Sequence, residues 1–173
     1  GARQVGKSTL VREFAANVGL PLWEINLEKH KNLNTVFGTL DPGQVLQEIA
    51  LTLNVSSPGR GKGILFLDEI QETPNALACL RYFHEELPDL AIIAAGSLLE
   101  FTLSQAEFSM PVGRVEYYWL GPLTFDEYLD GCGEHEAIAF LGNWKPGHTY
   151  PGALHQRLLR RLREYLLVGG MPE

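Results

Sequence analysis

The sequence predicts an α/β fold in which helices cover both faces of a parallel β-sheet. Two wholly apolar segments, 64–67 and 90–95, are bounded by turn residues, as expected for strands buried on both faces of such a sheet. Segments with apolar residues at helical spacing alternate with these strands, which is typical of βαβ units. The 173 residues, 45% hydrophobic and 20% charged, suffice for one compact domain with an ordinary core.

The remaining elements follow from periodicity and from turn residues. A helix is predicted over 7–18, where the apolar residues that share a face are Leu10, Val11, Phe14, Ala15 and Val18. We then expect a strand at 22–27, an irregular polar stretch at 28–41, a helix beginning at Asp41-Pro42-Gly43, a loop at 56–63 and a helix beginning at Thr73-Pro74. Further on we expect a less buried strand at 114–120, helices within 124–141 that break at Gly131-Cys132-Gly133, and a last amphipathic helix with Leu154, Leu158, Leu162, Tyr165 and Leu166.

The first eight residues, Gly-Ala-Arg-Gln-Val-Gly-Lys-Ser, match the phosphate-loop pattern G-x-x-x-x-G-K-[ST] at every fixed position. Glycines let such a loop curl so that its backbone N–H groups point at a phosphate, and the following helix adds the positive end of its dipole. Lys7 would contact the β- and γ-phosphates of ATP, and the Ser8 hydroxyl would bind Mg²⁺. The alternative is a glycine turn that matches by chance. The residues expected to bind nucleotide are Gly1, Ala2, Arg3, Gln4, Val5, Gly6, Lys7, Ser8 and Thr9.

An acidic pair, Asp68 and Glu69, follows the apolar strand 64–67. Because ligands of parallel α/β sheets bind at the carboxyl ends of the strands, Asp68 is expected beside the phosphate loop, where it would hold Mg²⁺ together with Ser8. Glu69 is then placed to orient or deprotonate the attacking water. An acidic pair that merely caps a core strand is the alternative interpretation, and the phosphate loop upstream disfavours it.

Two further residues are candidates for contact with the γ-phosphate. Ser97 follows the strand 90–95. We expect the strand that precedes the phosphate loop to lie between the two apolar strands, which would aim the Ser97 hydroxyl at that phosphate. The same serine fits equally well as the N-cap of a helix at 98–103. Arg114 would offset developing phosphate charge, although most arginines lie in solvent or pair with an acid.

Nucleic acid is a weaker candidate partner than ATP. The formal net charge is −7, so the chain as a whole is not a polyanion binder. The aromatic run Tyr117-Tyr118-Trp119 is expected to pack on the sheet rather than to stack on bases. The last predicted helix does carry a basic cluster, which either is solvated or contacts nucleic-acid phosphates. Its members are Arg157, Arg160, Arg161 and Arg163, of which the first three share a face.

Composition and the ends of the sequence bear on compartment and domain extent. Cys79 and Cys132 are too few and too far apart for a disulfide framework or a zinc site, and no apolar stretch is long enough to cross a membrane. We therefore expect a cytoplasmic protein with reduced thiols. Because the phosphate loop begins at residue 1, we expect a segment of a longer chain. Residues 1–150 would form an ATPase core that lacks its first strand, and residues 151–173 a helix leading into a further C-terminal domain.

Six segments together resemble a prokaryotic AAA+-type family, the archaeal and bacterial P-loop ATPases in which an AAA domain (AAA_14-like) is joined to a DUF4143 C-terminal region. The segments are Gly-Ala-Arg-Gln-Val-Gly-Lys-Ser (1–8), Leu-Asp-Glu-Ile-Gln (67–71), Ala-Gly-Ser (95–97), Pro-Val-Gly-Arg-Val (111–115), Leu-Gly-Pro-Leu-Thr-Phe-Asp-Glu-Tyr-Leu (120–129) and Tyr-Leu-Leu-Val-Gly-Gly-Met-Pro-Glu (165–173). The resemblance implies an AAA+-like core. The roles it implies are phosphate contact for Lys7, magnesium binding for Ser8, an acid pair for Asp68 and Glu69, a sensor for Ser97 and an arginine finger for Arg114.

The function expected from these residues is Mg²⁺-dependent binding and hydrolysis of ATP, which would drive or gate a conformational change in an attached domain or partner. A DNA-associated switch that responds to ATP occupancy with little turnover is the alternative. Glu69 favours turnover, because a pure switch needs no water-activating acid. A homo-oligomer is a further candidate assembly. Kinase activity toward small molecules is disfavoured, because no loop of the sequence is an arginine-rich lid.

Overall fold

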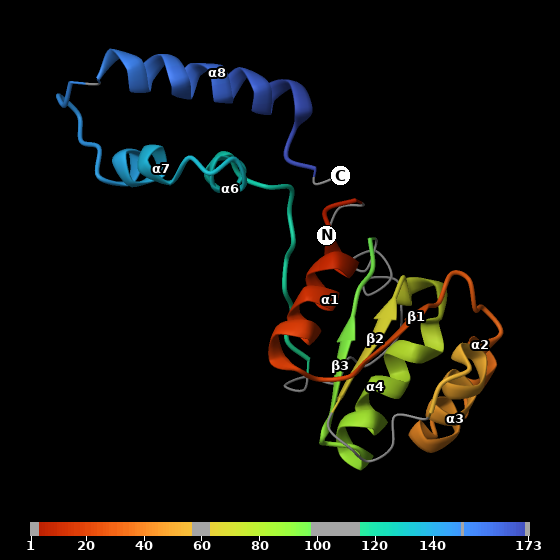
Figure 1. Ribbon diagram of the computed structural model, residues 1–173. Helices are drawn as coiled ribbons and strands as arrows, with labels where there is room; N and C mark the ends of the chain where they lie inside the picture. Colours follow the sequence, from red (N-terminus) through yellow and green to blue (C-terminus); the bar gives the residue numbers. More distant parts are fainter. Residues whose placement is uncertain (1–3, 57–62, 98–114, 150, 172–173) are drawn as a thin grey trace. The chain divides into compact units, whose positions relative to one another are not determined.

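The computed structural model of the chain describes residues 4–56, 63–97, 115–149 and 151–171. These residues form two compact units (Figure 1). The first is built from residues 7–119, and the second from residues 120–171 together with residues 4–6 at the amino end. The α/β sheet lies in the first unit, and the second unit is helical.

The sheet of the first unit has three parallel strands, β1 (Leu22–Asn26), β2 (Gly63–Asp68) and β3 (Leu90–Ala94), in the order β1-β2-β3. This confirms the predicted fold class, because helices flank the parallel strands on both faces (Figure 1). The register pairs Asn26 with Asp68 and Leu67 with Ala94, so the three carboxyl ends meet at one edge of the sheet. That edge is where parallel α/β sheets bind ligands.

One expectation about strand order is wrong. β2 pairs directly with β3 along its length, from Gly63 opposite Leu90 to Leu67 opposite Ala94. No strand therefore lies between the two apolar strands. β1 and β3 occupy both sides of β2, so the position expected for the strand before the phosphate loop is already filled.

Three helices cover one face of the sheet: α2 (Leu33–Phe37), α3 (Pro42–Leu53) and α4 (Pro74–Glu86) (Figure 1). Asp41 caps α3 by accepting a hydrogen bond from the Gln44 N–H at 3.1 Å, as its position before Pro42 predicts. The main core lies here. Its fully buried large side chains include Phe37, Phe83, Ile25, Leu27, Leu33, Ile49, Leu65, Leu67 and Ile70.

α2 corrects the expectation of an irregular stretch at 28–41. Its two apolar residues, Leu33 and Phe37, stand four positions apart on one face and are completely buried. Burying a side chain of this size stabilises a fold by roughly 1.5–3 kcal/mol, which outweighs the weak helix signal of the polar residues around it. The contacts that stabilise this short helix come from α3, the next helix, and from α4, which begins 37 residues after α2 ends, so the residues of α2 alone do not show them.

α1 (Lys7–Val18) covers the opposite face of the sheet, where Val11 packs against Phe66 and Ala95. The helix has its predicted bounds, but only part of its apolar face is buried. Val11 and Ala15 are buried, whereas Leu10 and Phe14 are 53% and 49% exposed. Val18 continues this exposed side. Apolar spacing thus identified the helix without showing how much of its apolar face contacts the sheet.

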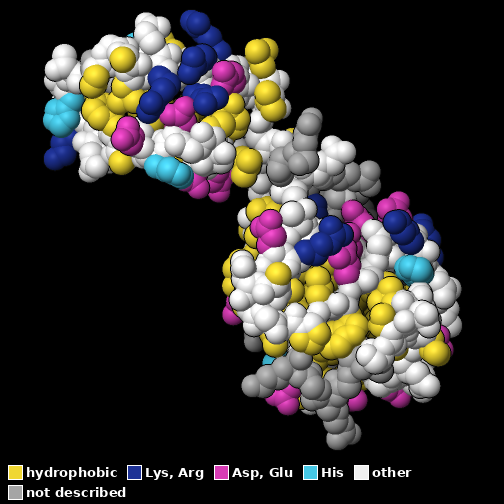
Figure 2. Space-filling view, in the orientation of Figure 1, with side chains coloured by type: hydrophobic (Ala, Val, Ile, Leu, Met, Phe, Trp, Pro, Cys, Tyr) yellow, Lys and Arg dark blue, Asp and Glu magenta, His cyan; other side chains and the backbone are white. Residues whose placement is uncertain are grey.

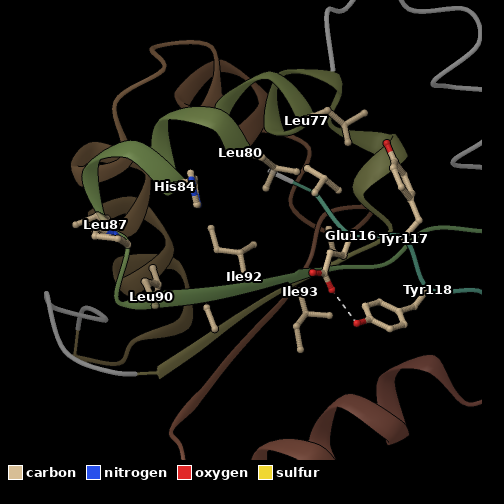
Figure 3. Close-up of a pocket in the computed structure, with 14 residues that line it drawn as sticks. Leu77, Leu80, His84, Leu87, Leu90, Ile92, Ile93, Glu116, Tyr117 and Tyr118 are labelled. Carbon is tan, nitrogen blue, oxygen red and sulfur yellow. Dashed lines mark hydrogen bonds between the residues drawn. The ribbon is translucent and has the colours of Figure 1, made fainter. Parts of the chain in front are cut away.

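The residues that follow the third strand also differ from expectation. Residues 115–120 form no regular strand, and Tyr118 is 86% exposed, so the aromatic run does not pack on the sheet as predicted. Within the described residues β3 pairs with β2 alone. An apolar pocket of about 540 Å³ lies along β3 and is bounded by α4 and by Val115–Tyr118 (Figure 3). The sequence pattern of 115–120 is that of a strand, but no described strand pairs with it.

The second unit contains α6 (Phe125–Gly131), α7 (His135–Gly142) and α8 (Gly152–Val168). A capping box begins α6, because the Thr124 hydroxyl accepts from the Glu127 N–H and the Glu127 carboxylate accepts from the Thr124 N–H. The predicted break at 131–133 is confirmed. Leu129, Ala137 and Leu158 form the core of the unit.

α8 packs against α6 and therefore belongs to the same compact unit as α6 and α7. The boundary between the two units lies near residue 120. The boundary expected at residue 150 concerns the extent of the ATPase core and remains a prediction. None of the helices in the described ranges is long and apolar enough to span a membrane.

Candidate nucleotide site

Two residues in the described part of the phosphate loop have positive φ angles, 58° at Gln4 and 83° at Gly6. A glycine adopts such an angle without steric cost, whereas the angle is uncommon for a glutamine. α1 begins at Lys7, so Lys7, Ser8 and Thr9 form its first turn. Backbone N–H groups in a first helical turn have no partner within the helix and can bind a phosphate. Gly1, Ala2 and Arg3 lie outside the described residues.

Ser8 and Asp68 meet at the carboxyl edge of the sheet. The Ser8 hydroxyl donates a hydrogen bond to Asp68 Oδ2 at 3.3 Å, although the two residues are sixty positions apart in sequence. Both are half-buried. The sequence placed these two residues together as Mg²⁺ ligands, and the structure brings their oxygens within hydrogen-bonding distance.

Asn26, which sequence reasoning missed, is a second donor to the same carboxylate. It ends β1 opposite Asp68, and its side-chain N–H donates to Asp68 Oδ2 at 3.4 Å. The Glu69 backbone N–H donates to the other oxygen, Oδ1, at 3.2 Å. Asn26 could have been identified from the sequence as a polar residue at the end of the strand before β2, the strand that ends at Asp68.

The Asp68 carboxylate is nevertheless costly to ionise. Burial raises its pKa above the usual range, and the adjacent Glu69 carboxylate raises it further. Hydrogen bonds from the Glu69 N–H and the Ser8 hydroxyl lower the pKa, but less than the first two effects raise it. The site therefore concentrates negative charge that its own donors do not fully offset, and a cation bound beside Asp68 would reduce that cost.

Mg²⁺ fits the donor set. It prefers oxygen ligands and is usually held by one or two protein oxygens together with phosphate and water oxygens. The Ser8 hydroxyl and the Asp68 carboxylate are oxygen donors 3.3 Å apart, close enough to contact one small cation. They lie in the first turn of α1 and at the end of β2.

Glu69 lies next to this pair in an unusual backbone conformation. Its φ and ψ angles are 53° and 48°, the left-handed region, which is uncommon for a residue other than glycine. It precedes a short 3₁₀ helix, η1 (Ile70–Glu72). The Gln71 side-chain N–H donates to Glu69 Oε2 at 2.5 Å. Sequence reasoning assigned no role to Gln71, although it belongs to the quoted segment 67–71.

Ser97 lies just beyond β3 and is half-buried. Its hydroxyl oxygen is buried and has no hydrogen-bond partner among the described residues. The ends of β2 and β3 are tied together, because the Ala95 N–H donates to Leu67 O at 2.9 Å and the Ile70 N–H donates to Ala95 O at 3.0 Å. Both readings of Ser97, sensor and N-cap, stay predictions. The expected helix at 98–103 and Arg114 lie outside the described residues.

The basic cluster of α8 is partly engaged in ion pairs. Arg157 Nε and Arg161 Nε contact the two carboxylate oxygens of Glu134 at 3.0 and 2.9 Å. Arg161 also contacts Glu164 at 2.8 Å. Basic and acidic side chains lie side by side on this unit (Figure 2). The shared basic face predicted from the sequence is therefore reduced, since two of its three arginines pair with Glu134.

Comparison with known proteins agrees with this geometry. The family model AAA_14, described as an AAA domain, matches residues 1–129, well over half of the 173 residues. Neither the curated proteins nor the solved structures gave a match. The matched region contains the phosphate loop, the acidic pair and Ser97. The chain therefore belongs to the AAA_14 family of AAA domains, a class of P-loop nucleotide-binding domains whose members are generally ATPases.

Proposed function

We propose that this chain binds ATP with Mg²⁺ and hydrolyses it. The observation that carries the proposal is the meeting of Ser8 and Asp68 at 3.3 Å, with Glu69 adjacent, at the carboxyl edge of a parallel sheet. Such an arrangement supplies a cation-binding pair and a separate acid within one site. The AAA_14 match supports nucleotide binding in general terms.

Each residue has a distinct task in this proposal. Lys7 and the backbone N–H groups of the loop bind and orient the β- and γ-phosphates. Ser8 and Asp68 hold Mg²⁺, which when bound neutralises charge on the phosphate oxygens. Glu69 accepts a proton from the water that attacks the γ-phosphate. Ser97 would contact the γ-phosphate and Arg114 would offset its developing charge, as the family resemblance implies.

Hydrolysis would then be coupled to an attached domain or partner. The resemblance to ATPases that carry a DUF4143 region supports this part of the proposal, whereas the family match itself ends at residue 129. A homo-oligomer or DNA as partner stays a candidate only. An ATP-occupancy switch with little turnover remains the alternative function, and a direct measurement of turnover separates the two.

Loss of Lys7 tests the nucleotide site. In the full-length protein, saturating Mg-ATP should raise the free energy of unfolding by about 2.7 kcal/mol at one hundred times the dissociation constant. Lys7→Ala should abolish this gain, because it removes the cation on the phosphates. Thermal melts of wild type and of Lys7→Ala, each with and without Mg-ATP, measure the gain and its loss. Lys145→Ala, at an exposed position of the second unit, is the matched control and should keep the full gain.

Phosphate release by the same protein, with and without DNA, then tests turnover and the candidate partner. If wild type and Lys7→Ala melt alike in saturating Mg-ATP, the phosphate-loop assignment is wrong. If Mg-ATP stabilises the wild type but no phosphate is released, the switch replaces the hydrolase.

A further inference from the structure

The turn after β2 is tightly constrained. The Ile70 N–H donates to Ala95 O at 3.0 Å, the Glu72 N–H to Glu69 O at 3.0 Å and the Thr73 N–H to Ile70 O at 3.0 Å. The Ile70 side chain is completely buried in the main core. These contacts fix η1 and hold Glu69 in its left-handed conformation. Strained backbone of this kind persists where the surroundings impose it, and it is concentrated at functional sites.

Within this turn the side chains of Glu69 and Gln71 contact each other. Gln71 Nε2 lies 2.5 Å from Glu69 Oε2. A carboxylate can only accept, so the Gln71 amide must present its N–H group to it, and this bond to a charged group is stronger than one between neutral groups. The Gln71 Oε1 atom is buried and has no hydrogen-bond partner in the described ranges. The bond to Glu69 is thus the hydrogen bond that orients this amide in the described structure.

The two acids of the site have separate donors. Asp68 accepts from Ser8, Asn26 and the Glu69 backbone, whereas the Glu69 side chain accepts from Gln71. The carboxylates of Asp68 and Glu69 are neighbours in sequence and carry like charge, so they repel each other. A donor dedicated to Glu69 opposes that repulsion and restricts the side-chain rotamers of Glu69. A general base must lie within hydrogen-bonding reach of the proton that it accepts, so its orientation limits the rate.

From this geometry we propose that Gln71 is a positioning residue for hydrolysis: its amide N–H holds the Glu69 carboxylate where that carboxylate accepts the proton of the attacking water. This inference rests on the proposed function, because it assigns Glu69 the role of base. The role assigned to Gln71 is exercised through Glu69, whose carboxylate it contacts. Its loss should therefore slow turnover and leave nucleotide affinity unchanged.

A double-mutant cycle in the full-length protein tests the proposal. Gln71→Met keeps the length of the side chain and removes its donor, and Glu69→Gln removes the base. Gln71→Met alone should lower kcat about 10–100-fold, the range typical for loss of a group that orients a metal-binding side chain. The dissociation constant for Mg-ATP and KM should stay within about two-fold of wild type. Gln47→Met, at an exposed position of α3, is the matched control and should leave kcat unchanged.

The Glu69→Gln background separates positioning from a structural role. If Gln71 acts through Glu69, adding Gln71→Met to Glu69→Gln should change kcat by less than about two-fold, because coupled residues are not additive. A merely structural glutamine would instead slow both backgrounds equally and weaken nucleotide binding. Wild-type kcat in Gln71→Met, or additive losses in the double variant, would overturn the inference while leaving the hydrolase intact. A wild-type protein that binds Mg-ATP without turnover would overturn the proposed function and this inference together.

Discussion

At the scale of single residues, Asp68 shows how a binding site can oppose stability. Its carboxyl is half-buried beside a second carboxylate, and its pKa is raised by burial first and by Glu69 second. Three donors contact it and do not fully offset these effects. A carboxylate whose charge its own donors do not offset is expected to lower the stability of the unliganded fold.

Asp68→Asn should therefore stabilise the nucleotide-free protein while removing the metal ligand. An acid with a raised folded-state pKa is more protonated in the folded chain than in the unfolded chain. The free energy of unfolding therefore falls as the pH rises from the ordinary aspartate pKa, near 3.9, through the raised pKa. The gain in free energy of unfolding of Asp68→Asn over wild type should grow across that pH range and persist at pH 7, at about 0.5–2 kcal/mol. Thermal melts from pH 4 to pH 7 measure it.

The same variant should lose the Mg²⁺ dependence of ATP binding, because the neutral amide that replaces the carboxylate is not an anionic ligand. Asp68→Asn melting at or below the wild-type temperature at pH 7 would contradict this account of the site. Asp89→Asn, in the turn before β3, removes an acid whose side chain lies outside the site and serves as control.

At the scale of elements, sequence patterns predicted those whose signal is local. The two apolar strands, the helix from Lys7 and the break at 131–133 all have their predicted places. α2 escaped prediction because buried Leu33 and Phe37 stabilise it through contacts with α3 and α4, which the polar residues around them do not indicate. The segment 115–120 has a strand pattern without a described strand partner. Pairing depends on what lies beside a segment, and spacing along the chain does not show that.

The ion pairs of Glu134 connect elements of the second unit. Glu134 precedes α7, is buried, and contacts Arg157 and Arg161 of α8. The hydrogen bond from Arg161 is the main cause that lowers the Glu134 pKa. Because its pKa is lowered, ionised Glu134 stabilises the folded chain fully at pH values above the usual glutamate pKa of about 4.3. This stabilisation is lost as the pH falls through the lowered pKa.

Glu134→Gln should accordingly lower the melting temperature of the protein by roughly 5 °C at pH 7, because it leaves two arginines without their acid. The deficit should shrink as pH falls through the lowered pKa, where wild-type Glu134 is itself protonated. Scanning calorimetry at pH 7 and at successively lower pH values follows this deficit in melting temperature. Glu136→Gln, at an exposed position of α7, is the control. A deficit that stays constant across the whole pH series would show that the ion pairs are not its cause.

At the scale of the molecule, the parallel sheet is what brings the site residues together. Ser8 follows the loop, Asn26 ends β1, Asp68 ends β2 and Ser97 follows β3, so four distant segments reach one edge of the sheet. The sequence brought Ser8 and Asp68 together because their motifs are local and the edge rule is general, whereas a site role for Ser97 stays a prediction. It missed Asn26 and Gln71, since their partners appear only once register and turn geometry are known.

Turnover by the Glu69→Gln variant of the full-length protein tests the central claim most directly. The glutamine keeps the size of the side chain and removes the proton acceptor, and loss of a general base typically costs about 10²–10⁴-fold in rate. We predict that Glu69→Gln binds Mg-ATP with wild-type affinity and releases phosphate slower by that factor. Phosphate release at the wild-type rate would contradict the assignment of Glu69 as the residue that activates water.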